Sequence, residues 1–238
     1  NLKDFNLNGT SKKFLTNAPL IQNANLEDYG TMPFLTFNNP IDRIRIAYYD
    51  SAGSSLGLEY LNFQDSTGAY DYWTKITSNE LLFVGCFPAN LRGWSTTFQN
   101  LVTAGTIQGG HYRINVVDNT NTLISDTYRI NVTCPNLKGY EPIRLTWLNQ
   151  WGGWDYYTFT MKSTKMISTK GSTYNQLAGT WNEKAYRIDS FKGGKKAFRV
   201  NATEKVTMNT DFVNESESQW FEELINSPEV YILEGFQD

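Results

Sequence analysis

Short runs in which apolar residues alternate or cluster recur along this chain, and turn-forming residues separate them. Residues 34–37, 44–48 and 58–61 are such runs, and residues 50–53, Asp-Ser-Ala-Gly, separate two of them. Alternation places apolar side chains on one face of a strand, while Asp, Ser and Gly accept the backbone angles of tight turns. The pattern predicts a mainly β protein.

The clearest predicted hairpin lies in the middle of the chain. Apolar and polar residues alternate over residues 112–117, which are predicted to form the first strand. Residues 118–121 form the predicted turn, and residues 123–132 form the predicted second strand. Such alternation fits a sheet with one buried face. The preceding stretch, residues 91–109, is weakly patterned and predicts either a short helix or a packed loop.

The length of 238 residues favours two domains. We place the boundary after Cys134 and Pro135, where the chain becomes more charged. Residues 1–30 are predicted to be an N-terminal arm or first strands. Residues 31–135 carry about nine short strands, which predict a sandwich of immunoglobulin-like or jelly-roll type. Residues 136–238 are predicted to form a second β-rich domain.

This second domain contains a long alternating segment and one helix. Apolar residues share one parity between Phe198 and Met208, with Glu204 as the exception, so a half-buried strand with a bulge near Glu204 is expected. Residues 215–226 begin with acidic residues after Asn214 and end before Pro228, which predicts a helix there.

Net charge and hydropathy limit the classes of partner that the chain is expected to bind. The formal charge is −3 and the sequence pI is about 5.3, whereas nucleic acid and anionic membranes attract clustered positive charge. No run approaches the roughly 18 apolar residues of a membrane-spanning helix. We therefore expect protein or glycan partners, and no nucleic acid or membrane. The chain begins at Asn1 without Met, and we expect a processed or incomplete polypeptide.

Catalytic motifs are missing from the sequence. His111 is the only histidine, which excludes His-based triads and paired-His zinc sites; we expect it at the surface, where a strand starts. There is no phosphate-binding loop and no Gly-x-Ser-x-Gly elbow. Asp155 is the strongest candidate for a paired-carboxylate glycosidase. The prediction is that the chain is not an enzyme and has no cofactor or metal.

Two cysteines occur, Cys86 and Cys134. Two thiols far apart in sequence do not make a disulfide-rich scaffold. We expect both to be free and buried.

An aromatic cluster surrounds the glycine pair at residues 152–153. Its members are Trp147, Trp151, Trp154, Tyr156 and Tyr157. Exposed rings of this kind stack on sugars or anchor protein interfaces, so Trp151, Trp154 and Tyr156 are candidate contact residues. The alternative is a role in the core and turn.

A basic segment with interleaved aromatic residues spans residues 184–199. Lys192, Lys195 and Lys196 lie in it, and the pattern superficially resembles a nucleic-acid patch. A hairpin turning at the glycine pair 193–194, with its lysines in water or at a subunit contact, explains it better. These three lysines are therefore candidate interface residues.

Three motifs resemble tail or other virion structural proteins of tailed bacteriophages. They are residues 14–19 (FLTNAP), residues 85–91 (GCFPANL) and residues 145–159 (LTWLNQWGGWDYYTF). The run at 220–231 (WFEELINSPEVY) adds to this similarity. The resemblance implies a multi-copy virion component, located at the tail or its junctions, whose partners are other virion proteins and copies of itself. The alternative is an adhesion module that binds host-surface glycan through the aromatic cluster.

Overall fold

A computed structural model describes residues 5, 7, 12–36, 43–62, 80–118, 120–133, 139–176 and 194–234. Structural statements below refer to these residues. The chain divides into two units. The first, here called the body, is Asn1–Met161 with Thr210–Asp238, and the second, here called the arm, is Lys162–Asn209.

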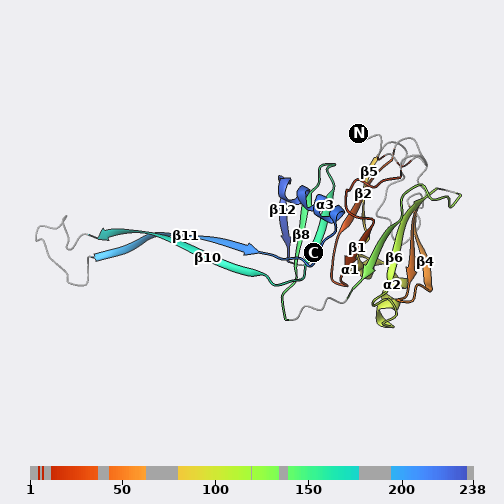
Figure 1. Cartoon of the computed structure of the whole chain (residues 1–238), viewed down its shortest axis with the longest axis horizontal. Coiled ribbons are helices and arrows are strands. Elements are labelled where there is room, and N and C mark those ends of the chain that lie inside the picture. Colours follow the sequence, from red (N-terminus) through yellow and green to blue (C-terminus); the bar gives the residue numbers. More distant parts are fainter. Residues whose placement is uncertain are drawn as a thin grey trace, which may run out of the picture. The chain divides into compact units, whose positions relative to one another are not determined.

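A five-stranded sheet with strand order β1-β7-β6-β3-β4 is the largest element of the body (Figure 1). Its strands are β1 (Ile21–Ala24), β7 (Tyr128–Val132), β6 (His111–Val117), β3 (Arg43–Tyr49) and β4 (Ser55–Asn62). The pairing of β1 with β7 is parallel, and the other pairs are antiparallel. Residues 44, 46 and 48 of β3 are buried, so the alternation seen in the sequence does define an inner face.

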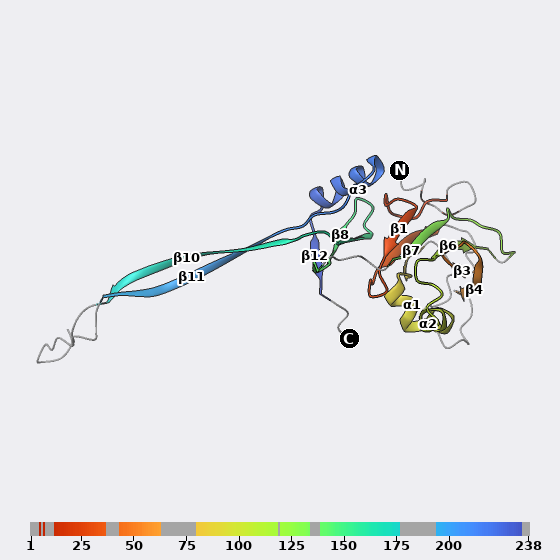
Figure 2. The same cartoon turned by 60° about the horizontal axis from the view of Figure 1, so that its bottom comes forward.

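The inner face of this sheet shares one hydrophobic core with a second pair of strands and two helices. The pair is β2 (Thr31–Thr36) with β5 (Glu80–Gly85). The helices are α1 (Pro88–Trp94) and α2 (Thr96–Thr103), and α2 lies beside β4 (Figure 2). Phe14, Phe34, Phe98 and Ile46 meet in this core.

A smaller, three-stranded sheet completes the body. Its order is β12 (Val230–Leu233), β8 (Ile143–Leu148) and β9 (Trp154–Phe159). Helix α3 (Glu215–Asn226) packs on it, with the rings of Trp147 and Trp220 5.0 Å apart. Asn214 begins α3 with a capping box, because its side chain accepts from Glu217 N while the Glu217 carboxylate accepts from Asn214 N.

The arm is a two-stranded antiparallel ribbon of β10 (Thr164–Gln176) and β11 (Gly194–Thr207). Its strands are the longest among the described residues. Asn209 Nδ2 donates to Lys162 O at 2.7 Å and joins the two ends of the arm. Nearly every described side chain of β10 and β11 is exposed.

The prediction of a mainly β chain is confirmed, and α3 occupies the residues at which a helix was expected. The weakly patterned stretch 91–109 contains parts of α1 and all of α2. Cys86 is a free, buried thiol, as predicted. Cys134 lies outside the described residues, and so do residues 134–138, so the boundary after residue 135 stays a prediction.

Three expectations were wrong in detail. Residues 198–207 of the predicted strand lie in β11, but β11 is exposed rather than half-buried, because nothing among the described residues covers it. Its register shift lies opposite Ser172 and Thr173, near Phe198 rather than Glu204. His111 does start β6, but its side chain is buried and stacks on the Tyr49 ring, 4.9 Å away.

Candidate interaction sites

The turn between β8 and β9 is built around Asn149. Its Oδ1 accepts from Trp151 N and Gly153 N, and its Nδ2 donates to Leu15 O at 2.9 Å. Gly152 has a φ of 82°, a conformation that favours glycine. A Cβ at Gly153 would collide with Pro33. The glycine pair therefore lets this turn lie tightly against the N-terminal part of the body.

The rings of the aromatic cluster are largely engaged within the body. Trp151 is half-buried, with its ring centroid 4.2 Å from that of Phe5. Trp154 is also half-buried and lies 5.8 Å from the Tyr231 ring. Trp147 is fully buried. These contacts place Trp147 in the core and place Trp151 and Trp154 against neighbouring rings of the body.

Tyr156 belongs to a different environment. Its hydroxyl is hydrogen bonded to Thr31 Oγ1 at 3.0 Å, and its ring lies 5.7 Å from the Phe87 ring. The Arg144 guanidinium lies 5.4 Å from the Tyr156 ring centroid. Tyr156 thus connects the small sheet of β8, β9 and β12 to β2 and α1.

Arg144 and Asp28 form a buried ion pair at this junction. Arg144 Nη1 lies 3.3 Å from Asp28 Oδ2, and both side chains are less than a tenth exposed. Arg144 also donates to Tyr29 O through Nε and Nη2, and to Thr158 Oγ1. Burial lowers the pKa of Arg144, and Asp28 opposes this shift. Removal of either partner would leave an uncompensated buried charge, which is strongly destabilising.

Asp155, the carboxylate considered for catalysis, is buried and surrounded by donors. Oδ1 accepts from Thr16 Oγ1 at 2.7 Å and from Asn149 Nδ2 at 3.1 Å, while Oδ2 accepts from Trp220 Nε1 at 2.7 Å. Burial raises the pKa of Asp155 to about 6, against the lowering effect of these hydrogen bonds. The geometry gives Asp155 a linking role between the N-terminal segment, the turn and α3.

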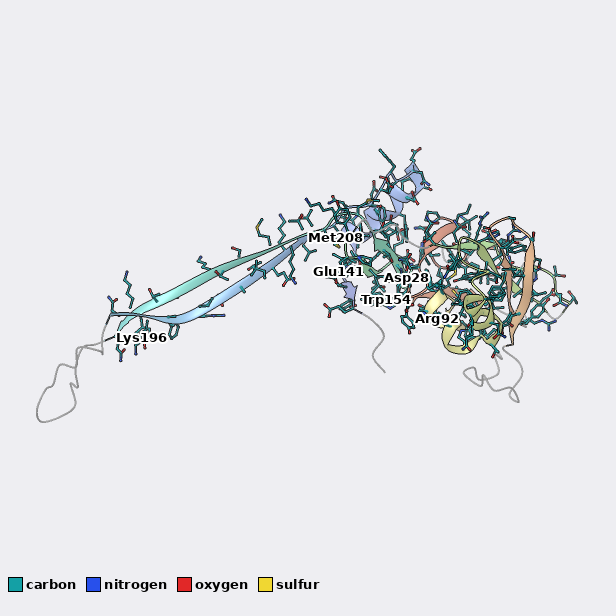
Figure 3. All side chains as sticks on the ribbon, turned by 90° about the horizontal axis from the view of Figure 1, so that it is seen from below. Asp28, Arg92, Glu141, Trp154, Lys196 and Met208 are labelled. Atoms are coloured by element: carbon teal, nitrogen blue, oxygen red, sulfur yellow. The ribbon has the colours of Figure 1, made fainter. Side chains whose placement is uncertain are left out.

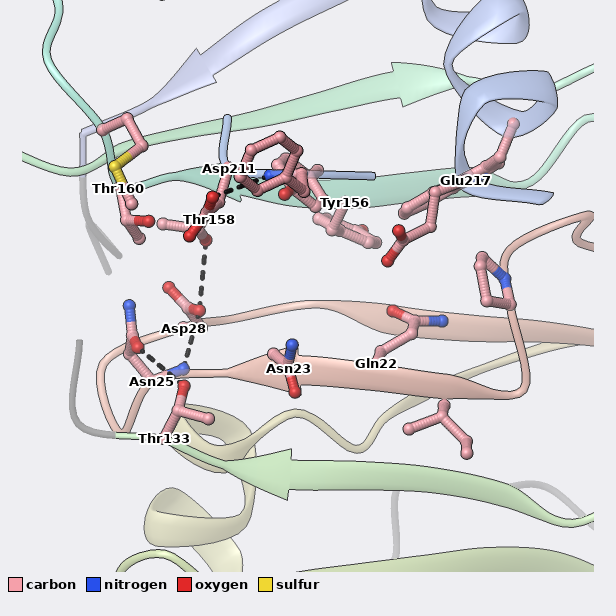
Figure 4. A pocket seen from close by; sticks show the side chains of 16 residues that line it. Gln22, Asn23, Asn25, Asp28, Thr133, Tyr156, Thr158, Thr160, Asp211 and Glu217 are labelled. Carbon is pink, nitrogen blue, oxygen red and sulfur yellow. Dashed lines mark hydrogen bonds between the residues drawn. The ribbon is translucent and has the colours of Figure 1, made fainter. Parts of the chain in front are cut away.

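A polar cavity of about 450 Å³ lies in the body between β1 and β9. Figure 4 shows Gln22, Asn23 and Asn25 on the β1 side, facing Tyr156 and Thr158 on the β9 side. Amide, hydroxyl and carboxylate groups dominate its lining, with Asp28, Asp211 and Glu217 among them.

The arm presents two different faces, because residues paired across an antiparallel ribbon point to the same side. One face carries Met166, Tyr174 and four cationic side chains, which are Lys170, Lys196, Arg199 and Lys205. The opposite face, here called the apolar face, carries Lys195 and the Lys165–Glu204 ion pair, and on it Ile167 and Val200 are 61% and 62% exposed. Figure 3 shows side chains extending freely along the ribbon, with Lys196 near one end and Met208 near the other.

The contact residues predicted from the sequence therefore lie in different parts of the structure. Trp151 and Trp154 pack within the body, and Tyr156 lines the polar cavity. Lys195 and Lys196 are exposed on β11, and Lys192 lies outside the described residues. Sequence reasoning missed the cavity and the Arg144–Asp28 pair, whose members come from distant parts of the chain. No local pattern marks either one.

Within the described part of the chain, no group of three or more His, Cys, Asp or Glu side chains is placed to hold a metal ion. None of the helices described is long and apolar enough to cross a membrane.

Comparison with known proteins gives little further guidance. No protein-family model matches the chain, and no curated protein matches it. One solved structure, described as "Chaperone-tip adhesin complex is vital for synergistic activation of CFA/I fimbriae biogenesis", is 11% identical and is aligned over 92% of this chain and 97% of its own. The TM-score is 0.21, a value at which the likeness carries no argument.

Proposed function

We propose that this chain is a multi-copy structural component of a tailed phage virion, at the tail or a tail junction, and that it works through protein–protein contacts rather than catalysis. Its partners are other virion proteins and copies of itself. We also propose a domain architecture. In it, the core shared by the five-stranded sheet and the β2–β5 pair is the core of a sandwich, and a second β-rich domain follows.

The observation that carries this proposal is the arm. A two-stranded hairpin alone is at best marginally stable in water. β10 and β11 nevertheless run for 13 and 14 residues with exposed apolar side chains and no core of their own among the described residues. In an assembly, a neighbouring subunit can bury the exposed apolar side chains of the arm.

The motifs at residues 14–19, 85–91 and 145–159 support the virion assignment by their resemblance to phage tail proteins. Two of these motifs contribute to the packing of the body. Phe14 and Leu15 are buried, and the Asn149 turn holds Leu15 by a hydrogen bond.

Quantitative mass spectrometry of purified virions of the encoding phage tests the proposal. We expect the chain in several copies per particle, at a constant ratio to the major tail protein. Particles that lack the polypeptide altogether would overturn the assignment.

A second candidate function, recognition of host-surface glycan, is favoured by the polar cavity. Its amide and hydroxyl groups beside Tyr156 are of the kind that bind sugars. A glycan array probed with the wild-type chain and with Asn23→Ala tests it, and Trp154→Ala tests the aromatic cluster. Binding that neither substitution weakens would remove the basis of this candidate.

A further inference from the structure

We infer that the arm of one copy binds the α3 region of a second copy, in the groove beside that helix, with the basic face and the apolar face of the arm both in contact. This inference rests on the proposed function, since it names the partner surface of the arm. It is drawn from the charge, the exposure and the area of the two surfaces.

The charges of the chain are segregated between neighbouring segments. Residues 162–209 contain ten Lys and Arg against three Asp and Glu, a net charge of +7. Residues 210–238 contain eight Asp and Glu and no Lys or Arg, a net charge of −8. Surfaces of opposite sign attract and orient one another, whereas two arms, or two α3 regions, repel. The pairing with the best charge match in a homo-oligomer is therefore arm to α3 region.

The receiving surface has a suitable shape. A groove of about 920 Å³ lies beside α3, and Gln150, Gln219, Glu222 and Glu223 are among the residues that line it, with no basic residue in the lining. Glu222 is exposed, while Glu223 accepts hydrogen bonds from Asn17 and Gln150. Near the groove, Ile225 of α3 is 83% exposed and offers an apolar contact.

The arm has enough surface area for a stable interface only when more than one of its faces is in contact with the partner. Thirteen residues of β10 span about 43 Å at about 3.3 Å per residue. With two strands about 4.8 Å apart, each flat face offers roughly 430 Å². A stable interface needs about 800 Å² per partner. One flat face does not reach this value, and a groove of about 920 Å³ receives only part of the ribbon. The exposed surface around α3, which includes Ile225, therefore has to supply the rest of the contact.

A contact of this kind is heterologous, because two different surfaces meet. Each copy has one arm and one α3 region, so the contact repeats from copy to copy. It then closes a ring or continues as a filament, as a multi-copy virion component requires.

Charge reversal on purified full-length protein tests the inference. The arm variant is Lys170→Glu with Lys196→Glu, both on the basic face. The receptor variant is Glu222→Lys with Glu229→Lys, both exposed. A matched control, Lys12→Glu with Lys13→Glu, makes the same charge change at exposed body positions. Sedimentation velocity at 50 and 500 mM NaCl measures association, and circular dichroism checks that each variant folds.

The wild type and the control are expected to self-associate at 50 mM NaCl and to dissociate at 500 mM. The arm and receptor variants should each associate at least tenfold more weakly. Mixing these two variants should restore association, because the arm of one then meets an α3 region of opposite charge on the other. Combining all four changes in one chain should restore it as well.

Failure of the mixture to associate, while the wild type does, would overturn the inference. A wild type that stays monomeric but binds a random-sequence DNA duplex through Lys170 and Lys196 would also overturn it, in favour of a nucleic-acid arm. Neither result depends on whether particles contain the chain, so the inference and the proposed function can fail separately.

Discussion

The Asp155 carboxylate shows how one buried residue links three segments. Its partners are Thr16, Asn149 and Trp220, which come from the N-terminal segment, the β8–β9 turn and α3. All three groups donate to it, so the carboxylate is the acceptor on which they converge. Burial still outweighs these hydrogen bonds and raises its pKa.

Asp155 is expected to make the body more stable in mild acid than at neutral pH. The pKa of Asp155 is raised from 3.8 to about 6, so the folded state holds its proton more tightly than the unfolded state does. This contribution is complete below pH 4 and is lost as the pH rises through 6, at a cost of about 3 kcal/mol. Urea unfolding between pH 4.5 and 7 measures it.

Asp155→Asn serves as the control for this titration. The substitution should remove the part of the pH dependence that lies between pH 4 and 6. It should also lower stability at pH 4.5 by about 1–3 kcal/mol, because an amide nitrogen would face a donor such as Trp220 Nε1. Equal pH slopes for the variant and the wild type would contradict the assignment.

Sequence reasoning did not predict this role for Asp155. In the sequence, Asp155 stands beside aromatic residues, a pattern that suggests a catalytic role, and such a role requires solvent access. Its actual partners lie 139, 6 and 65 residues away in sequence. Asn149 is brought close by the β8–β9 turn, but only tertiary packing brings Thr16 and Trp220 to the carboxylate, and no periodicity or local motif indicates those two contacts.

For single elements, the sequence predicted correctly those features that depend on neighbouring residues alone. The bounds of α3 followed from Asn214 at its start and Pro228 after its end, because capping and helix termination depend on neighbouring residues. The strand character of residues 198–208 followed from alternation. Its burial did not, because burial depends on what covers the strand.

The apolar face of the arm is expected to contribute to association and not to folding. Ile167→Thr with Val200→Thr keeps β-branched side chains on that face, and both residues are more than half exposed. Stability should therefore change by less than about 0.5 kcal/mol, while self-association weakens about tenfold. Thermal unfolding and sedimentation velocity measure the two effects.

The control changes two exposed leucines of the body, Leu58→Thr with Leu81→Thr. It should leave association unchanged. An equal loss of association in the control would show that exposed apolar area in general, rather than the arm, drives the contact.

In the molecule as a whole, buried and exposed side chains are divided between the two units. The buried residues lie in the body, and none of the described residues of the arm is buried. The charge segregation between residues 162–209 and 210–238 is visible in the sequence. Its meaning depends on the structure, because only the structure shows that the described part of the basic segment is an exposed ribbon and that a groove lies beside the helix of the acidic segment.

Removal of the arm should leave a folded body that does not assemble. The hydrogen bond from Asn209 to Lys162 O holds the ends of the arm together, so Gly-Gly can replace residues 163–208 without strain on the body. Since none of the arm residues that the structure describes is buried, the Tm of the body should stay within about 3 °C of the wild type. Calorimetry measures the Tm, and sedimentation velocity should show a monomer at 50 mM NaCl. If the shortened chain still self-associates, the subunit contact lies on the body; if its Tm falls by 10 °C or more, the arm has a stabilising role that its exposed side chains do not explain.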